Sequence, residues 1–401
     1  MARTSTRLGG SSSLSDYINA GVLVRCLPRS AVDEALIKHG RQSIRERAMP
    51  AYLVVYFVVA LGLYMGVAYE EVLRSFLEGW RWLRRESGPL KVASKGAISQ
   101  ARERLGYEVM ADLAARCLQP LASSSTLGAY FAGRRLVSLD GSTLELADEV
   151  GNARDFGYPG RSRGEAAFPQ LRFVGLLETG THAWLAAEID SYATSEITLA
   201  KRLTSRLRDD QLCLADRGFV GYPLFHAVQA TGAAILWRAR STHAFPVLER
   251  YPDGSYRSLF RADRAARQES QPDLPVRVIA FQLMTNDGVS HPYKLITTLT
   301  PAEASAGELA ALYRERWEIE TSLDELKTHL KGPRVAMRSK TPDLVKQEFY
   351  GLILAHYAIR RLMFEAAQSA AVDSDRLSFT QATRSLRRRL PHSGALPPRA
   401  A

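Results

Sequence analysis

The stretch RRLVSLDGSTLEL, Arg134 to Leu146, is where the sequence changes from a helical to a strand-like period. Apolar and polar residues alternate from Leu136 onward, which is the pattern of a β-strand with one buried face. Asp140 and Gly141 interrupt the alternation, and this dipeptide is a common hairpin turn. We expect a strand that stops at Asp140, and a plain hairpin turn there remains the alternative.

Short strands and helices follow one another after this strand. QLRFVGLLETGTHAWLAAEID, from Gln170, predicts two strands joined by a hairpin at 178–181. SEITLAKRLTSRL predicts a helix, DQLCLADRGF predicts a short buried strand that ends at Asp216, and Tyr222 to Gln229 predicts a second helix. This order predicts an α/β fold in which helices cover a mixed sheet.

A β-rich insertion is expected over residues 233–304. AAILWRAR, SYRSLF, LPVRVIAFQLM and PYKLITTL are strand-like, and the dipeptides DG at 253 and 287 favour hairpin turns. The helix that follows has a capping box, with Ser305 three residues before Glu308. The α/β core is therefore expected in two parts, 129–232 and 305–370.

The first 128 residues predict an all-α domain, and residues 371–401 predict a loose tail that is basic and then Pro-rich. RSAVDEALIKHG predicts a helix with Ser30 as its N-cap and Gly40 as its end. The segment from Ser94 to Gly106 combines basic and small residues as a recognition helix does. A DNA-contacting helix and a basic surface helix both fit this pattern.

One apolar run allows two interpretations. AYLVVYFVVALGLYMGVAY, Ala51 to Tyr69, has no charged residue, and Gly62 and Gly66 form a GxxxG motif. The run is long enough to span a bilayer. A fully buried helix that begins after Pro50 would have the same composition.

The composition indicates a globular protein with a polyanionic partner. The chain has 401 residues, a net charge of +11 and a pI near 9.6. Its three cysteines are far apart, which argues against a zinc site or a disulfide framework. The N-terminus lacks the apolar core of a signal peptide.

The charged stretch YRERWEIETSLDELKTHL, 313–330, places several groups on one helical face. At about 100° per residue, Arg316, Glu320 and Lys327 fall within one narrow stripe near Tyr313. Asp324 also lies on the stripe, where we interpret it as a rim residue. A solvated face held by i,i+4 ion pairs is the alternative to a catalytic face.

Three carboxylates stand at comparable places in the predicted fold. Asp140 and Asp216 end strands, and Glu320 lies on the later helix; catalytic groups favour the carboxyl ends of strands in α/β sheets. Converging there, they would hold two Mg²⁺ ions about 4 Å apart, an arrangement that serves phosphodiester cleavage and strand transfer. Each aspartate alone also fits an ordinary turn or helix cap.

Trp237 stands beside Arg238 in the first strand of the expected insertion. A buried core position is the ordinary interpretation of this tryptophan. An aromatic ring next to arginines would alternatively stack on an unpaired base. His182, alone in a predicted strand, is interpreted as structural.

The motifs LDGS, LADRGF and YRERWEIETSLDELK together resemble the three signatures of DDE transposases of the insertion-element-four family. The third matches that family's Tyr-x2-Arg-x3-Glu-x6-Lys pattern without a gap, and the second matches its Asp-Arg-Gly-Phe block. The N-terminal helical region resembles that of the family as well, so the similarity covers roughly residues 20 to 365. The matched positions are Tyr313, Arg316, Glu320 and Lys327, and Asp216, Arg217, Gly218 and Phe219.

The resemblance implies an RNase H-like core, Mg²⁺ or Mn²⁺ as cofactor, and cut-and-paste transposition through hairpin DNA ends. It implies that Asp140, Asp216 and Glu320 bind the metal ions. DNA contacts are expected from Tyr313, Arg316, Lys327, Arg217 and Arg238, with Trp237 as the candidate for stacking on a flipped base. Further implications are binding of terminal inverted repeats by the N-terminal region, a homodimer that pairs two ends, and a cytoplasmic protein whose apolar run is buried.

Three other interpretations of the function remain open. An inactive DNA-binding repressor or relic would bind the element ends without nicking them. A stand-alone nuclease with the same core would cleave without joining ends. A membrane-anchored protein is the last alternative, and cell fractionation would reveal it.

Overall fold

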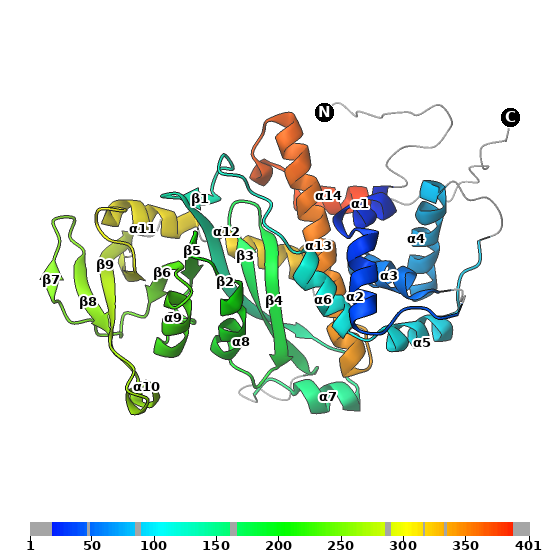
Figure 1. Ribbon diagram of the computed structural model, residues 1–401, viewed down its shortest axis with the longest axis horizontal. Coiled ribbons are helices and arrows are strands. Elements are labelled where there is room, and N and C mark those ends of the chain that lie inside the picture. The colour runs from blue at the N-terminus through cyan, green and yellow to red at the C-terminus, as the bar shows by residue number, and fades with distance from the viewer. Residues whose placement is uncertain are drawn as a thin grey trace.

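The computed structural model describes residues 18–45, 49–84, 90–160, 167–284, 290–315, 317–332 and 335–387. In Figure 1 the N-terminal helices gather at one end of the molecule and the last strands of the sheet lie at the other. The long helix α13, Pro342–Ala370, stands between them. Apolar residues from the N-terminal helices, the sheet and α13 therefore share one core.

The N-terminal part is helical, as predicted. Its helices are α1 (Ile18–Cys26), α2 (Arg29–Lys38), α3 (Ala51–Leu63), α4 (Tyr69–Arg84), α5 (Lys95–Leu105) and α6 (Glu108–Cys117). The apolar run forms α3, which is buried from Leu53 to Leu63 and packs against α13. Among the described helices, none is long and apolar enough to cross a membrane.

Helices α3 and α13 approach each other closely because glycines line their contact. A Cβ atom at Gly351 would lie 2.6 Å from the carbonyl oxygen of Val58, and one at Gly62 would lie 2.9 Å from the Cα of Leu352. Gly66, the other glycine of the GxxxG motif, has no such neighbour within 4 Å. Only one glycine of the motif therefore serves helix packing.

The described strands form a single mixed sheet in the order β4-β3-β2-β5-β6-β10-β9-β8-β7, with β1 paired to β2. Strands β2, β5 and β6 are parallel, and the other pairs are antiparallel. The strands are β1 (Tyr130–Phe131), β2 (Arg134–Glu145), β3 (Gln170–Glu178), β4 (Ala183–Ser191), β5 (Gln211–Ala215), β6 (Ala234–Ala239), β7 (Glu249–Arg250), β8 (Tyr256–Phe260), β9 (Leu274–Met284) and β10 (Ser290–Thr297).

Strand β2 runs through Asp140 instead of stopping there. Asp140 pairs with Gly175 and Gly141 with Val174, so the ladder with β3 is unbroken. Both expectations for this dipeptide, a strand end and a hairpin turn, are wrong because pairing with β3 continues through both residues and outweighs the local turn preference. The hairpin predicted between β3 and β4 is confirmed.

The β-rich insertion extends the core sheet and does not form a sheet of its own. The expected boundary at 233 falls before β6, yet β6 pairs in parallel with β5 and so belongs to the core. Strands β10, β9, β8 and β7 then continue from its edge. The turn at Asp253 lies between β7 and β8 as predicted, whereas the dipeptide at 287 lies outside the described residues.

Helices cover both faces of the central strands. On one face α8 (Glu196–Leu203) and α9 (Tyr222–Gln229) pack on the sheet. On the other, α11 (Ala306–Glu315) packs on the same strands, and α12 (Trp317–Asp324) contacts β2. The predicted capping box begins α11, since the Ser305 amide donates to Glu308 Oε2 at 2.8 Å and the Glu308 amide donates to Ser305 Oγ at 3.3 Å.

Two local predictions fail near the chain ends. Helix α2 begins one residue before Ser30 and has Pro28 at its N-cap, so Ser30 caps nothing. Part of the predicted loose tail is the helix α14, Phe379–Arg387, whose Leu386 is buried against the N-terminal core. The remaining described helices are α7 (Val150–Phe156) and α10 (Arg264–Gln268).

Candidate active site

Asp140 and Asp216 are neighbours on adjacent parallel strands. The register pairs Leu139 of β2 with Ala215 of β5, and the two aspartates each come one residue later. Neighbouring strands lie about 4.8 Å apart. Leu214, two residues before Asp216, packs in the core with α11, and side chains alternate along a strand. Both carboxylates therefore lie on the face of the sheet that α11 and α12 cover.

Backbone amides orient the two aspartates. Asp140 Oδ1 accepts a hydrogen bond of 2.8 Å from the amide of Gly141. Asp216 Oδ1 accepts one of 2.7 Å from the amide of Gly218, in the turn that follows β5. Both residues are half-buried. The LDGS and LADRGF motifs thus supply the carboxylates and also the amides that fix their direction.

Arg238 extends the same row by one strand. Ala215 of β5 pairs with Trp237 of β6, so Arg238 is the neighbour of Asp216. The carbon of its guanidinium lies 3.9 Å from the centre of the Tyr293 ring. A cation and an aromatic ring therefore stand at the edge of the aspartate pair.

Tyr313 attaches the end of α11 to the strand that leads to Asp216. Its hydroxyl donates to the carbonyl oxygen of Ala215 at 3.2 Å, and the side chain is only 4% exposed in α11. Tyr313 positions the helix in this structure. The contact between its hydroxyl and a phosphate stays a prediction.

Lys327, three residues beyond the end of α12, is attached to β2. Its Nζ donates to Ser142 Oγ at 2.6 Å, and Ser142 lies two residues beyond Asp140 on the same face of the strand. Glu320, exposed on α12, lies between Tyr313 and Lys327 in sequence. The segment that carries Glu320 is thus held at both ends to the two strands that carry the aspartates.

The expected catalytic stripe is only partly described. Arg316 lies outside the described residues. Residues Glu325–Leu330 form a π-helix, so a uniform rotation of 100° per residue does not extend to Lys327. Asp324 is exposed and pairs with His329 at 3.2 Å, in keeping with its interpretation as a rim residue.

The donor chemistry of the site suits a hard divalent cation, because Asp140, Asp216 and Glu320 offer only carboxylate oxygens. Two of the three are neighbours in register. Within the residues that the structure describes, no group of three or more His, Cys, Asp and Glu side chains is close enough to hold a metal ion. Glu320 therefore does not complete a metal-sized cluster with the aspartates here.

The structure does not support Trp237 as a base-stacking residue. Its side chain is 0% exposed and packs edge-to-face on Phe225 of α9, with ring centres 5.5 Å apart. Alternation along β6 places Trp237 on the face opposite to Arg238. The hydrophobic core thus accounts for this tryptophan.

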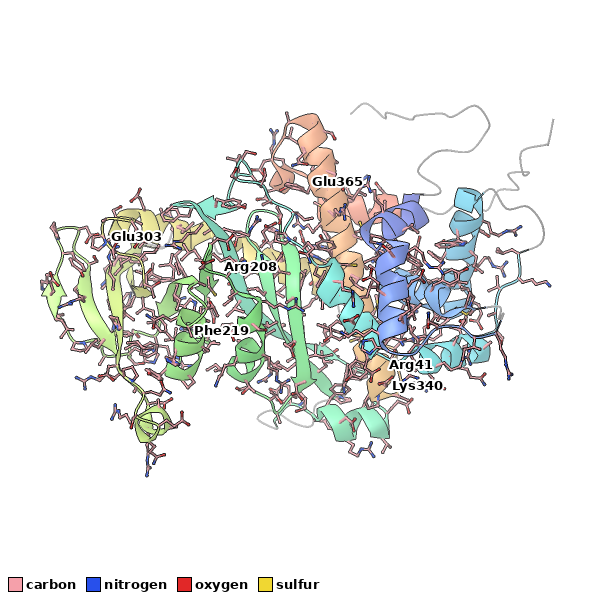
Figure 2. All side chains as sticks on the ribbon, in the orientation of Figure 1. Arg41, Arg208, Phe219, Glu303, Lys340 and Glu365 are labelled. Atoms are coloured by element: carbon pink, nitrogen blue, oxygen red, sulfur yellow. The ribbon has the colours of Figure 1, made fainter. Side chains whose placement is uncertain are left out.

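Arg217 and Phe219 of the second motif have different surroundings. Arg217 is exposed directly after Asp216, where a DNA backbone can reach it. Phe219 is buried in the core formed by the sheet with α8 and α9, and Figure 2 shows it in this region. The motif thus combines one metal-ligand candidate, one surface cation and one packing residue.

Glu196 borders the site, and sequence patterns gave no indication of it. A Cβ atom on Gly141 would lie 3.0 Å from Glu196 Cδ, so this side chain covers β2 from the face opposite to Asp140. Burial raises the pKa of Glu196; the positive charge of Arg172 opposes this rise and the negative charge of Asp216 adds to it. A contact between a helix N-terminus and a distant glycine has no signature in one sequence.

The expected recognition helix, α5, has a mixed character. Ser94 caps it as predicted, accepting a bond of 3.4 Å from the Ala97 amide. Arg102, however, is only 1% exposed and donates to Gln347 at 2.8 Å and to Ser339 at 3.0 Å. It joins α5 to the segment around the start of α13 and is not placed to touch DNA.

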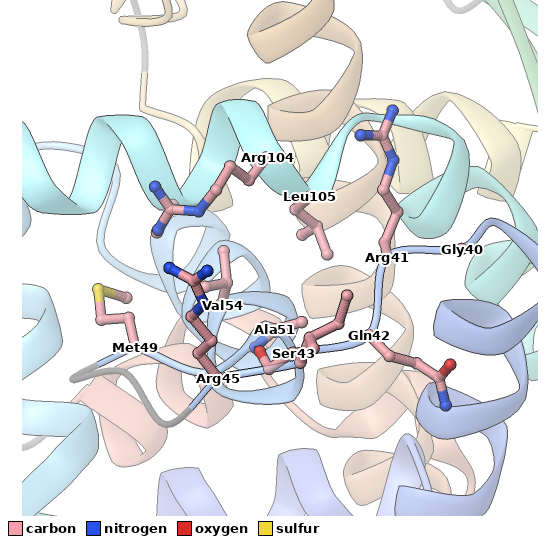
Figure 3. A pocket seen from close by; sticks show the side chains of 12 residues that line it. Gly40, Arg41, Gln42, Ser43, Arg45, Met49, Ala51, Val54, Arg104 and Leu105 are labelled. Atoms are coloured by element: carbon pink, nitrogen blue, oxygen red, sulfur yellow. The ribbon is translucent and has the colours of Figure 1, made fainter.

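A basic pocket of about 380 Å³ lies between α5 and residues 40–45. Arg45 and Arg104 extend to the same side of it, and Arg41 lies farther along the wall (Figure 3). Val54 and Leu105 contribute apolar lining. Of its three arginines only Arg104 belongs to α5, and the other two come from residues 40–45.

Comparison with known proteins identifies the family. Residues 17–115 match the family described as insertion element 4 transposase N-terminal, and residues 131–358, more than half of the chain, match the transposase DDE domain. The chain is a DDE transposase of the insertion element 4 family. This transposase is accordingly an enzyme that acts on DNA by strand cleavage and strand transfer, and its class uses divalent metal ions.

Two curated relatives of the transposase come from Escherichia coli (strain K12). It is 28% identical to the transposase InsG for insertion sequence element IS4 over 360 residues, which cover 89% of this chain and 77% of the relative. It is 22% identical to the putative transposase InsZ over 220 residues, which cover 55% and 71%. A piggyBac transposase synaptic complex with hairpin DNA has 12% identity and a TM-score of 0.48, covering 96% of this chain and 82% of that one.

Proposed function

We propose that the transposase moves an insertion sequence by a cut-and-paste reaction. It cleaves DNA at the two terminal inverted repeats and joins the released 3′ ends to a target. The observation that carries this proposal is the pair Asp140 and Asp216 on adjacent strands, faced by a Glu320-bearing segment that Tyr313 and Lys327 attach to those strands.

Asp140, Asp216 and Glu320 are the residues that would hold the divalent ions, two Mg²⁺ or Mn²⁺. When bound, such ions stabilise charge on the attacking and leaving oxygens of a phosphodiester. The backbone amides of Gly141 and Gly218 keep the two aspartates oriented before DNA arrives. Glu320 is exposed on α12, the helix that contacts β2.

Cationic side chains around this row would hold the DNA strand in place. Lys327 stands at Ser142 on β2, Arg217 is exposed after β5, and Arg238 stands beside Asp216 on β6. These cations lie near the ends of neighbouring strands, an arrangement that suits contacts with successive phosphates of a DNA backbone. Arg316, from the same signature, is proposed as a further phosphate contact.

We also propose that the ends are released as hairpins, with a base flipped out of the duplex. Trp237 cannot receive that base because its ring is enclosed by the core. Arg238 lies next to Asp216 and stacks on Tyr293. This pair offers a flat cationic surface beside the aspartates, on which a flipped base can stack.

The helical N-terminal part is proposed to bind the terminal repeats. The pocket that Arg41, Arg45 and Arg104 line combines guanidinium groups with apolar wall residues, which suits phosphate and sugar contacts (Figure 3). Pairing of two ends further suggests a homodimer in the DNA complex.

The test is an excision assay with purified transposase, Mg²⁺ and a plasmid that carries the DNA flanking its gene. The proposal expects both ends to be nicked, closed as hairpins and released, and the released element to be captured by a target plasmid. Binding without a nick would support an inactive DNA-binding protein instead. Cleavage without end joining would support a nuclease.

A further inference from the structure

Glu325, Arg360, His356 and His182 form a buried cluster of ionisable side chains, here called the Glu325 cluster. The side chains are between 0% and 5% exposed. Arg360 donates to Glu325 Oε2 from Nε at 2.8 Å, and its NH2 group contacts Glu325 Oε1 and His182 Nδ1. His356 Nε2 lies 3.2 Å from Glu325 Oε2. Since a carboxylate only accepts hydrogen bonds, His356 donates from Nε2.

The cluster joins three elements that are distant in sequence. Glu325 begins the π-helix directly after α12, five residues beyond Glu320. Arg360 and His356 lie on α13, and His182 lies in the turn between β3 and β4 with a positive φ of 56°. A fourth tie comes from Ser322 of α12, whose hydroxyl donates to the carbonyl oxygen of His182 at 3.4 Å.

We propose that the Glu325 cluster is a positioning device for the active site: it fixes the rotation of the helical segment that presents Glu320 and Lys327 to the aspartate pair. This inference rests on the proposed function of those residues. Arg360 and His182 touch neither DNA nor metal in this proposal, so they act through the backbone of α12 and the π-helix.

The local helix geometry supports a positioning role. π-Helices are rare, and short π segments within helices occur often at functional sites. Here the segment lies between Glu320 and the end of the helix, and Lys327, its third residue, is bonded to Ser142. Bonds from Arg360 and His356 to Glu325, the first residue of the π-helix, set the direction in which the next residues project.

The chemistry of the cluster points the same way. Burying charged groups gains little stability over an apolar core, so such clusters are retained for a defined geometry more readily than for stability. Burial works against ionisation of Glu325, yet its contacts with His182 and His356 and the charge of Arg360 lower its pKa well below the usual range. The carboxylate thus stays charged and keeps its directional bonds.

Two conservative variants test the proposal. Arg360→Lys keeps the charge but loses the planar fork that binds Glu325 and His182 together, and Glu325→Gln keeps the shape but loses the charge. Arg102→Lys is the matched control, because Arg102 is an equally buried arginine bonded to Gln347 and Ser339, away from the π-helix.

The readouts are Mn²⁺ affinity, measured by calorimetric titration without DNA turnover, and hydrogen exchange of peptides that cover 317–330. We expect Arg360→Lys and Glu325→Gln to weaken Mn²⁺ binding on the order of tenfold or more, the usual effect of residues that orient metal ligands. Exchange in 317–330 should rise, because the segment is no longer held in one orientation. Arg102→Lys should leave the Mn²⁺ affinity unchanged.

Unchanged Mn²⁺ affinity and unchanged exchange in 317–330 for both cluster variants would overturn the positioning role and leave a structural cluster. If one variant fails to fold, the other decides. A comparison of Mn²⁺ binding by wild-type transposase and by Glu320→Gln separates this result from a failure of the proposed function. Equal Mn²⁺ binding by these two proteins would show that Glu320 is no metal ligand, whatever the cluster does.

Discussion

The close contact between α3 and α13 can be tested with a single methyl group. In Gly351→Ala, the new Cβ would lie 2.6 Å from the carbonyl oxygen of Val58 and 2.8 Å from Val58 Cγ1. The oxygen belongs to the backbone of a buried helix and cannot rotate away, so the two helices must separate. Overpacking of this kind costs about 1–3 kcal/mol, and we expect the upper part of that range.

The intrinsic preference of alanine for helices offsets part of this cost, about 1 kcal/mol. The net loss in the free energy of unfolding is therefore about 2 kcal/mol, which corresponds to a fall in Tm of about 2–3 °C for a chain of this length. Thermal unfolding followed by circular dichroism measures it. Gly66→Ala is the control, because nothing lies within 4 Å of its new Cβ.

A Tm for Gly351→Ala that equals or exceeds that of Gly66→Ala would refute the reasoning. The apolar run would then not be packed closely against α13. This result would also remove the physical reason for treating the N-terminal helices and α13 as one core.

Three further outcomes are expected. Lys327→Ala should weaken binding of the element ends and reduce the slope of log affinity against log salt by about one phosphate contact, whereas an unchanged slope would remove Lys327 from the DNA interface. Trp237→Ala should create a core cavity and lower the free energy of unfolding in urea by about 3–5 kcal/mol. A variant that stays stable but fails to form hairpin ends would instead show that Trp237 stacks on a base. Burial lowers the pKa of His356 in the folded protein. As the pH drops below about 6.5, this histidine therefore binds a proton in the unfolded chain before it does so in the folded one, and the free energy of unfolding should fall. His356→Gln should flatten this fall in a pH series of denaturant titrations, and an identical profile would contradict it.

Elements with strong local signals were predictable from the sequence. The helix α9 has the predicted bounds, and the hairpin β3–β4 and the capping box of α11 formed as their residues indicated. The dipeptide at Asp140 misled the prediction, because its pairing with β3 outweighs turn propensity. Trp237 was predictable in principle, since alternation with Arg238 places only one of the two on the face of the aspartates.

The rest of the site depends on tertiary contacts that one sequence does not carry. Glu325 binds Arg360, and Arg360 also contacts His182, so these bonds join segments far apart in the chain. The same holds for the contact of Glu196 with Gly141. The end of the core at β6 was misplaced because its apolar sequence fits a core strand and an insertion strand equally well.

The most direct test of the central claim compares wild-type transposase with Glu320→Gln in single-turnover cleavage of a labelled element end with Mg²⁺. The account predicts that the variant folds and binds the end like wild type, while cleavage falls by at least about 10²-fold, since a charged ligand and not a DNA contact is lost. Cleavage by Glu320→Gln at a rate near that of wild type would contradict the assignment of Asp140, Asp216 and Glu320 as the catalytic triad.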